Sequence, residues 1–301
     1  MPANFPEVWV NRVIENITSA DKAPWLDGIP ELDVDVTQMG AGSPSESNVI
    51  HIPVAKIAPE VLLNNGTYPL TSMTFSDTET IVKLDKYETV PTGVSDDQVI
   101  GASYNKIDVV TRGHVVALTS YKFAKSLHAL APSTNTANTP VLNATGAVVG
   151  NRKRLIYDDL VALKQKLDKM ECPVEGRRVV LCAEHYNDLL LDRERFGNLL
   201  VNYTAGMVAP IIAGFEVFQY IKNPIYNSLT LAKRPFASIP QVGDLPASVA
   251  FYKENVAKKT GLTKQYFKNA IMDPENPVNK LNYRHYFLVT NIELKYIGAI
   301  I

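Results

Sequence analysis

Apolar residues recur at the helical spacing in two parts of the chain. Between residues 95 and 132 they return at nearly every third or fourth position, and Ser95 with Gln98 forms a capping-box pattern where this run begins. Pro132 ends the run, so the pattern predicts a helix of about 37 residues, roughly 55 Å long. A second, shorter helix is predicted where four apolar residues share one face: Leu160, Leu163, Leu167 and Met170.

Other segments carry β-branched and apolar residues in alternation or in short continuous runs, as strands do. A short helix is predicted over 184–191, and Gly214 falls between two β-rich runs, where it can supply a turn or a bulge. The chain is therefore predicted to mix helices and strands. The segments that we predict as strands are 32–36, 48–54, 80–89, 177–182, 247–252 and 284–294.

The strands predicted over 48–54 and 80–89 form a hairpin with an unusually long connection. Pro59, Pro69 and the run Asn64–Gly66 keep that connection from being a regular helix or strand. Hairpin turns normally take two to five residues, and a connection of about 25 residues predicts a projecting loop with a function. A projection has little core of its own, so its large apolar residues are candidate assembly contacts: Val61, Leu62, Leu63, Tyr68 and Leu70.

The first 47 residues are predicted to form an arm. Prolines at positions 2, 6, 24 and 30 exclude regular helix from most of it and leave one short apolar stretch, Val8–Ile14. Fully extended, thirty residues reach on the order of 100 Å, far beyond a compact subunit's radius. We therefore expect residues 1–30 to contact mainly neighbouring subunits and to be dispensable for folding, with Trp9 and Val10 as candidate assembly contacts.

The middle and the end of the chain suggest two lobes. Residues 133–140 are polar and poor in core-forming side chains, so they are predicted to connect a first lobe to a second. The strands predicted over 247–252 and 284–294 are expected to return to the first lobe. No internal repeat is present, which argues against a solenoid or a propeller.

Composition excludes several classes of protein. The 301 residues are 46% apolar, enough for an ordinary core, and the 30 basic and 31 acidic side chains nearly cancel, so no net charge draws the chain onto nucleic acid. The N-terminus has no signal-peptide pattern, and no apolar run is long enough to span a bilayer. Two cysteines, Cys172 and Cys182, are too few for a disulfide framework or a zinc site, which favours a reducing compartment.

No pattern in the sequence points to catalysis. The phosphate-binding, dinucleotide-binding, zinc-protease and serine-hydrolase motifs are all missing. The five histidines are scattered, and the only two in one predicted element, His114 and His128, are four turns apart, too far to share a metal. Asp158–Asp159 stands at a predicted helix start, where capping is the expected role. We therefore predict no enzyme activity, no catalytic residue, no cofactor and no metal.

Taken in order, the arm, the long hairpin, the long helix, the second lobe and the late strands resemble the HK97-type major capsid proteins of tailed bacteriophages. The resemblance covers nearly the whole chain and rests on the order and apolar placement of its parts, since no invariant signature is involved. The segments that carry it are Lys83–Thr89; Arg177–Leu181 with Tyr186, Leu189–Leu190, Gly206 and Gly214–Val217; and Ala247–Phe251 followed by Val256 and Gly261.

The resemblance implies an α+β protein with the HK97-like capsid fold. It implies an N-terminal arm (1–47), an extended loop (48–90), a peripheral domain with a long spine helix (91–140), an axial domain (141–245) and a return to the peripheral domain (246–301). The implied function is structural: self-assembly as pentamers and hexamers into an icosahedral head that encloses double-stranded DNA without reading its sequence.

The resemblance also implies where and with what the subunit works. The implied partners are copies of itself and scaffold, portal and cement proteins, with no membrane, in a virion assembled in the host cytoplasm. Two alternatives stay open. One is an encapsulin-like compartment that encloses a cargo enzyme, and the other is an α+β enzyme without a sequence signature, which would need a deep pocket with convergent polar groups.

Overall fold

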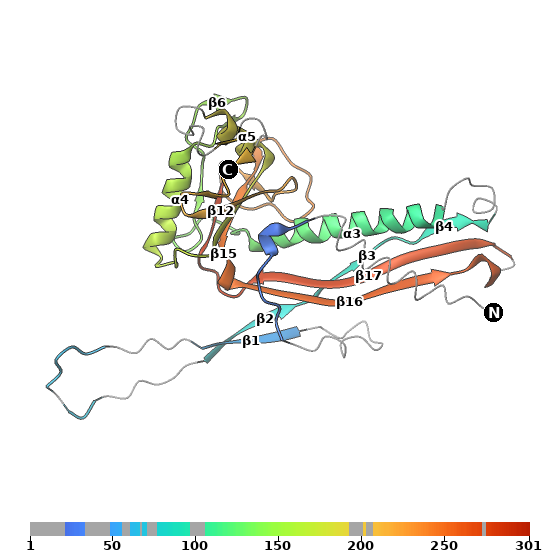
Figure 1. Cartoon of the computed structure of the whole chain (residues 1–301), viewed down its shortest axis with the longest axis horizontal. Helices are drawn as coiled ribbons and strands as arrows, with labels where there is room; N and C mark the ends of the chain where they lie inside the picture. The colour runs from blue at the N-terminus through green and yellow to red at the C-terminus, as the bar shows by residue number, and fades with distance from the viewer. Residues whose placement is uncertain are drawn as a thin grey trace.

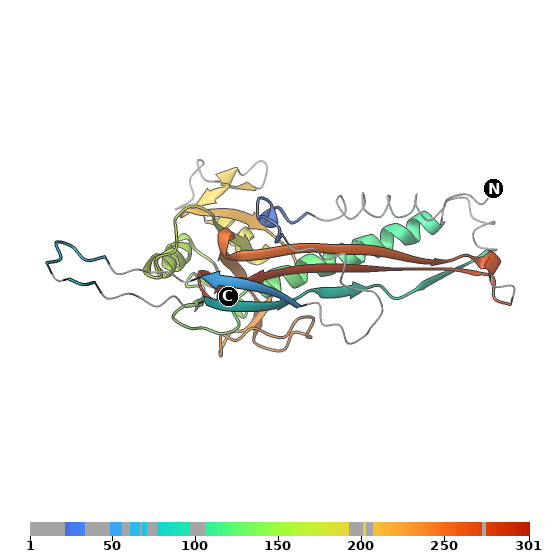
Figure 2. The ribbon, with the colours of Figure 1, turned by 90° about the horizontal axis from the view of Figure 1, so that it is seen from below.

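The computed structural model describes residues 22–33, 49–55, 61–66, 68–70, 77–96, 106–192, 201–202, 207–272 and 275–301. The molecule is elongated and has three parts. A compact lobe lies at one end of a long helix and a long hairpin that run side by side, and a second, thinner hairpin projects in the opposite direction (Figures 1 and 2).

The long helix is α3, which spans Lys106–Leu130 and is 25 residues or about 37 Å long. It ends two residues before Pro132, which confirms the predicted stop. Ser95 closes strand β4 and Asp96 is helical, as expected for a helix that begins after Ser95. Residues 97–105 lie outside the described part of the chain, so the continuity of the predicted helix is not tested. Lys233 caps the last turn by donating from Nζ to the carbonyl oxygens of His128 at 2.7 Å and Ala131 at 2.6 Å.

The long hairpin consists of β16 (Val256–Lys268) and β17 (Val278–Asn291), which pair antiparallel with a bulge between Thr260 and Thr263. Strands β3 (Asp85–Glu88) and β4 (Thr92–Ser95) pair with the other edge of β17. In β17 buried residues alternate with less buried ones, so one face packs on α3 and the other meets solvent.

The compact second lobe is built on a six-stranded sheet with the strand order β11-β12-β8-β15-β18-β5. Helices α4 (Tyr157–Lys169) and α5 (Ala183–Leu191) pack against it, and both lie where the sequence predicts them. The strands of this sheet are β5 (Val141–Leu142), β8 (Arg177–Leu181), β11 (Ile211–Ile212), β12 (Phe215–Gln219), β15 (Ser248–Tyr252) and β18 (Ile297–Ile300).

Two local predictions in this lobe are confirmed. Ala213 and Gly214 have φ of 50° and 80° and join β11 to β12 as a two-residue turn, which explains the glycine at this position. Asp159 caps the start of α4, where its Oδ2 accepts hydrogen bonds from the backbone N–H groups of Ile156 at 3.0 Å and Thr145 at 3.2 Å.

One expectation about the late strands differs from the structure. β15 pairs with β8 and with β18, so residues 247–252 belong to the sheet of the second lobe and do not return to the first. The return is made by β16 and β17 instead. The boundary expected at residue 246 therefore does not coincide with a change of lobe.

The remaining described elements have seven residues or fewer. They are η1 (Pro24–Leu26), β1 (Val49–Ala55), β2 (Asp77–Lys83), β6 (Val148–Val149), β7 (Arg152–Lys153), β9 (Val201–Asn202), β10 (Met207–Val208), β13 (Ile225–Asn227), β14 (Asp244–Pro246), η2 (Lys253–Asn255) and η3 (Ala270–Met272).

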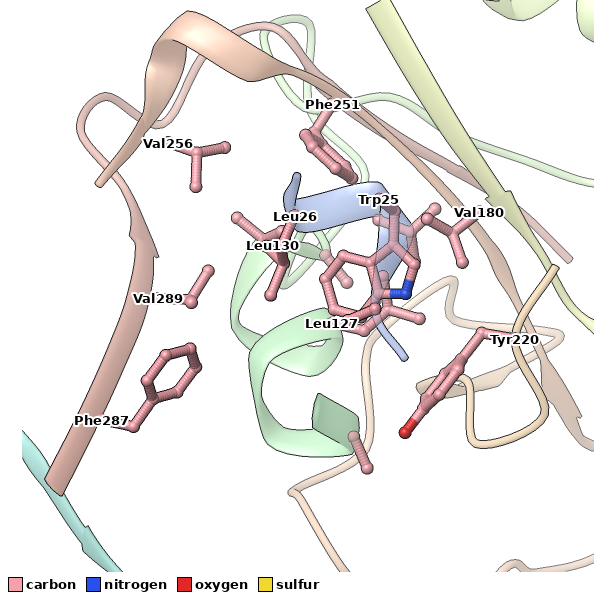
Figure 3. Packing of buried hydrophobic residues seen from close by; sticks show 14 of the residues in the cluster. Trp25, Leu26, Leu127, Leu130, Val180, Tyr220, Phe251, Val256, Phe287 and Val289 are labelled. Carbon is pink, nitrogen blue, oxygen red and sulfur yellow. The ribbon is translucent and has the colours of Figure 1, made fainter. Parts of the chain in front are cut away.

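The expectation for the arm is wrong for residues 22–33, which we call the anchor segment. Trp25 is fully buried, and Leu26 and Ile29 are buried beside it in the core that joins α3, the long hairpin and the sheet (Figure 3). The indole ring of Trp25 meets the ring of Tyr220 edge to face, with centroids 5.9 Å apart. Removal of residues 1–30 would therefore damage the subunit's own core.

Hydrogen bonds also hold the anchor segment to its own subunit. Arg178 in β8 donates from Nη1 to the carbonyl oxygens of Trp25 at 3.0 Å and Asp27 at 2.6 Å. Glu31 makes a parallel bridge with Lys258, and its carboxylate accepts from Thr260 Oγ1 at 2.6 Å. The predicted strand at 32–36 lies mostly outside the described residues, so its pairing beyond Asp33 is not tested.

Buried histidines are expected to make the subunit less stable in acid. His185 is 2% exposed and bonds through Nδ1 to Ser248 Oγ at 2.8 Å, and burial lowers its pKa to about 4. The unfolded chain then binds a proton that the folded chain does not, so stability is complete above about pH 6.5 and falls as the pH drops toward 4. The loss at this site is on the order of 3 kcal/mol.

The measurement is the urea midpoint at pH 7.5 and pH 4.5 for the natural protein and for His185→Asn, whose amide can replace Nδ1 without titrating. We expect the variant to lose less stability between the two pH values. Equal losses in both proteins would show that His185 does not control the acid response.

Both cysteines are free and buried, as packing residues are. Burial raises the pKa of the Cys182 thiol to about 12, and it also raises the pKa of Cys172, so neither thiol is ionised near neutral pH. We expect Cys172→Ser and Cys182→Ser, made singly, to fold and assemble with a loss of at most about 1–3 kcal/mol in stability. Electron microscopy and urea unfolding measure both. A folded serine variant that forms no particles would give that thiol a role in assembly.

Candidate assembly interface

The thin hairpin consists of β1 and β2, which pair antiparallel from Val49 opposite Lys83 to Ala55 opposite Asp77. With the connection 56–76 we call it the extended hairpin. The pairing confirms the hairpin predicted from the sequence, and the described residues of the connection, 61–66 and 68–70, lie beyond the second lobe, on the left in Figure 1. A small cluster fixes its root, where Val82 and Leu84 pack on Leu288 of β17.

Ion pairs lie next to this root. Glu88 bonds to Arg284 across the β3–β17 ladder at 2.5 Å and to Lys86 at 3.1 Å. Burial alone would raise the pKa of the Glu88 carboxyl, but the hydrogen bonds from Lys86 and Arg284 lower it below its ordinary value. Glu88 is therefore ionised at neutral pH. Its ion pair with Arg284 supports the register of β3 against β17, near the point where the extended hairpin joins the body of the subunit.

The tip of the extended hairpin is apolar and uncharged. We call residues 61–66 and 68–70 the loop tip, and none of them carries a charge. The side chains of Val61, Leu62 and Leu63 are 88%, 52% and 87% exposed, and those of Tyr68 and Leu70 are 75% and 58% exposed. All five residues predicted as contacts in the loop therefore lie together on the projection.

Exposure of these five side chains in water forgoes roughly 1.5–3 kcal/mol each relative to full burial. A monomeric protein rarely keeps so many large apolar groups on one protrusion, and such a surface marks a binding site. The two predicted arm contacts, Trp9 and Val10, lie outside the described residues and stay a prediction.

The sequence reasoning missed two further apolar projections. In the second lobe, Leu229, Ile239 and Val242 are 89%, 86% and fully exposed, and at the end of the long hairpin Ile271 and Met272 are 85% and 77% exposed. A signal for the first group was available. Residues 238–243 place Ile239 and Val242 among Ser, Pro, Gln and Gly, the same combination of apolar and turn-forming residues that identified the loop tip.

A groove of about 660 Å³ lies between β3 and α3. It holds His114, whose pKa is lowered by burial, and the paired Lys86 and Glu88. No serine or cysteine is among its described lining residues.

Metal-ligand clusters and membrane-spanning helices are two further features for which the described residues can be inspected. Within the described ranges, no three histidine, cysteine or carboxylate side chains gather closely enough to hold a metal ion. None of the described helices is both long and apolar enough to cross a bilayer.

Solved structures share this architecture. A chain from the capsid of cyanophage P-SCSP1u superposes with a TM-score of 0.63 at 14% identity, over 85% of this chain and 84% of that one. A chain from Mycobacterium phage Che8 superposes with a TM-score of 0.56 at 16% identity, over 91% and 97%. The chain has the HK97-type capsid fold. The fold predicted from the order of the sequence elements is thereby confirmed.

A virus-like particle also contains a chain with a similar fold. A chain from a virus-like particle of Pyrococcus furiosus superposes with a TM-score of 0.55 at 7% identity, over 99% of this chain and 100% of that one. Comparison of the sequence itself with protein-family profiles and with curated protein sequences gives no match. The similarity to these solved structures therefore lies in the fold.

Proposed function

We propose that this chain is the major capsid protein of a tailed bacteriophage, a structural subunit without enzymatic activity. The observation that carries the proposal is the loop tip, where five large apolar side chains between 52% and 88% exposed project from a subunit with a capsid fold. A shell gives each copy of the loop tip a neighbour against which to bury these groups.

The finer features of this proposal follow the fold. The subunit assembles as pentamers and hexamers into an icosahedral head around double-stranded DNA, in the host cytoplasm, with separate scaffold, portal and cement proteins. We propose that α3 with the long hairpin forms the peripheral domain and that the second lobe forms the axial domain. The nearly balanced charge of the chain is consistent with enclosing DNA without binding a particular sequence.

Electron microscopy of negatively stained particles from cells that express the chain tests the proposal, together with sedimentation of the purified protein. We expect closed shells, or ring-shaped capsomers where a scaffold protein is needed. A protein that is monomeric at every concentration and ionic strength, and that stays so with the phage's own scaffold protein, would contradict the proposal.

A compartment of the encapsulin type is the second candidate, favoured by the similarity to the Pyrococcus furiosus particle over the whole of both chains. The contents of purified particles separate the two functions. Double-stranded DNA inside particles from phage-infected cells supports the phage head, whereas a folded cargo enzyme and no DNA would support the compartment.

A further inference from the structure

A second cavity, of about 630 Å³, lies between the anchor segment, α3 and the long hairpin. We call it the Lys122 cavity. Its wall is partly apolar, formed by Leu26 and the rings of Phe123 and Phe287, and partly polar. No part of the proposed assembly function uses it, since it lies under the anchor segment and away from the loop tip.

Lys122 enters this cavity as a buried cation without a partner. Its residue is only 6% exposed, and its ammonium group has no hydrogen bond or ion pair with any described residue. The Nζ atom lies instead over two rings, 4.8 Å from the centroid of Phe123 and 4.6 Å from that of Phe287. Glu31 lines the same cavity and favours the charged form of Lys122, but the two make no ion pair. The buried ammonium therefore lacks a hydrogen-bonded anion among the described residues, which is costly and favours a bound anion.

His285 supplies a second buried group without a partner. It is 1% exposed, it lines the same cavity, and its ring stacks on that of Phe287 with centroids 6.0 Å apart. Its Nδ1 lies 2.8 Å from Thr263 Oγ1, while its Nε2 has no hydrogen-bond partner among the described residues. When the threonine hydroxyl donates to Nδ1, the neutral ring carries its proton on Nε2 and offers it to a ligand.

The charged groups among the described residues that line the cavity carry both signs. The lining includes three lysines, Lys22, Lys122 and Lys258, and two carboxylates, Asp27 and Glu31. Burial lowers the pKa of His285 to about 3, so it adds no charge at neutral pH. Burial lowers the pKa of Lys122 to about 8, with a smaller opposing effect from Glu31, so this lysine stays mostly protonated at pH 7.

We propose that the Lys122 cavity binds a monocarboxylate, with the carboxylate oxygens accepting hydrogen bonds from the Lys122 ammonium and from His285 Nε2–H. The apolar part of the ligand contacts the rings of Phe123 and Phe287. A monocarboxylate adds a single negative charge beside Asp27 and Glu31, whereas a phosphate dianion would add two. Either a free short-chain acid or an acidic side chain of a peptide can supply this group.

Chemical labelling of lysines tests the proposal at residue resolution. The full-length protein, as subunits or as particles, is acetylated with a limiting amount of an amine-reactive ester at pH 7, and the extent at each lysine is read by peptide mass spectrometry. With sodium butyrate at constant ionic strength, we expect the acetylation rate of Lys122 to fall at least fivefold in a saturable manner. The rate at Lys125, one turn further along α3 over Phe236, is expected not to change.

Three other probes define the chemistry. n-Butanol has the same apolar chain without the charge and should give no protection, and inorganic phosphate should protect less than butyrate. The peptide acetyl-Val-Glu-Val-amide is compared with its Gln counterpart. Protection by the Glu peptide at tenfold lower concentration than butyrate assigns the ligand to an acidic side chain, and the reverse order assigns it to a free acid.

Variants separate binding from folding. Lys122→Met should remove the increase in thermal stability that butyrate gives, while Lys125→Met should keep it. Because the ammonium carries the binding, the butyrate effect should also fade as the pH rises through about 8. Protection by butanol or by chloride equal to that by butyrate would overturn the proposal. So would a Lys122 whose acetylation butyrate does not alter, and neither result depends on whether the protein forms shells.

Discussion

Replacing Leu62 and Leu63 together by aspartate is expected to block shell formation, or to weaken it severely, while the circular dichroism of the subunit stays nearly unchanged. The two side chains are 52% and 87% exposed and contribute nothing to the described cores. Charges placed there are solvated in the free subunit, so folding is not affected. At an interface they would have to be buried without a partner, which costs far more than the lost apolar contact.

Repetition makes the expected effect large. A net gain of even about 1 kcal/mol per contact, lost at every copy of an interface, moves the equilibrium of a closed shell by many powers of ten. Sedimentation velocity and circular dichroism on the same preparations measure assembly and folding separately.

A matched control places the same two charges in the same loop without removing an apolar group. Asn64→Asp with Gly66→Asp meets this need. Asn64 has a φ of 53°, which aspartate tolerates, and a Cβ at Gly66 meets no other atom within 4 Å. We expect this control to assemble markedly better than Leu62→Asp with Leu63→Asp. Unfolding of the leucine variant would place the loop in the core, and wild-type shells from it would remove the loop tip from the interface.

The extended hairpin could be predicted from the sequence because local signals agree along it. Two extended runs flank a connection too long for a turn, and prolines and an Asn–Asn–Gly run prevent that connection from forming regular structure. The apolar residues in it are therefore out of place for a solvated loop. The structure bears this out with strands β1 and β2 and with five exposed apolar side chains.

The position of Trp25 could not be predicted in the same way. Pro24 and Pro30 indicate an irregular segment, and an irregular segment with apolar residues can pack on its own subunit or on a neighbour. Sequence spacing does not distinguish the two, because the deciding partners, Tyr220 and Arg178, lie more than 150 residues away. The reach of a fully extended chain does not decide between the two, since Trp25, Leu26 and Ile29 lie in the core of their own subunit.

The misplacement of β15 has a different cause, and a signal was available. The first four residues of β15 are all buried, and the run Ser248–Tyr252 contains no charge, as expected for a strand in the middle of a sheet that is covered on both faces. β17 instead alternates buried and exposed residues, as a strand with one solvent face does. The continuous uncharged run in β15 and the alternation in β17 therefore distinguish a strand of the second lobe's sheet from a strand of the long hairpin.

Trp25→Ala is expected to destabilise the subunit by about 3–5 kcal/mol, the range for loss of a fully buried aromatic side chain from a core. Trp25 is completely buried where the anchor segment, α3 and β8 meet, so the cavity left behind touches all three parts of the molecule (Figure 3). Urea unfolding of the subunit, followed by circular dichroism, measures the loss. Trp25→Phe should reduce the stability much less. The indole N–H has no hydrogen-bond partner among the described residues, so this substitution removes only part of the side chain's volume.

The other tryptophan of the chain provides the matched control. Trp9 is predicted to contact neighbouring subunits, so Trp9→Ala should leave the subunit's free energy of unfolding in urea unchanged within about 0.5 kcal/mol and should weaken assembly instead. The two substitutions remove the same side chain from the same N-terminal part of the sequence, so they separate folding from assembly. If Trp25→Ala left the subunit as stable as the natural protein, the anchor segment would not belong to the core in solution, and an arm that packs on neighbouring subunits along its whole length would again explain the data better.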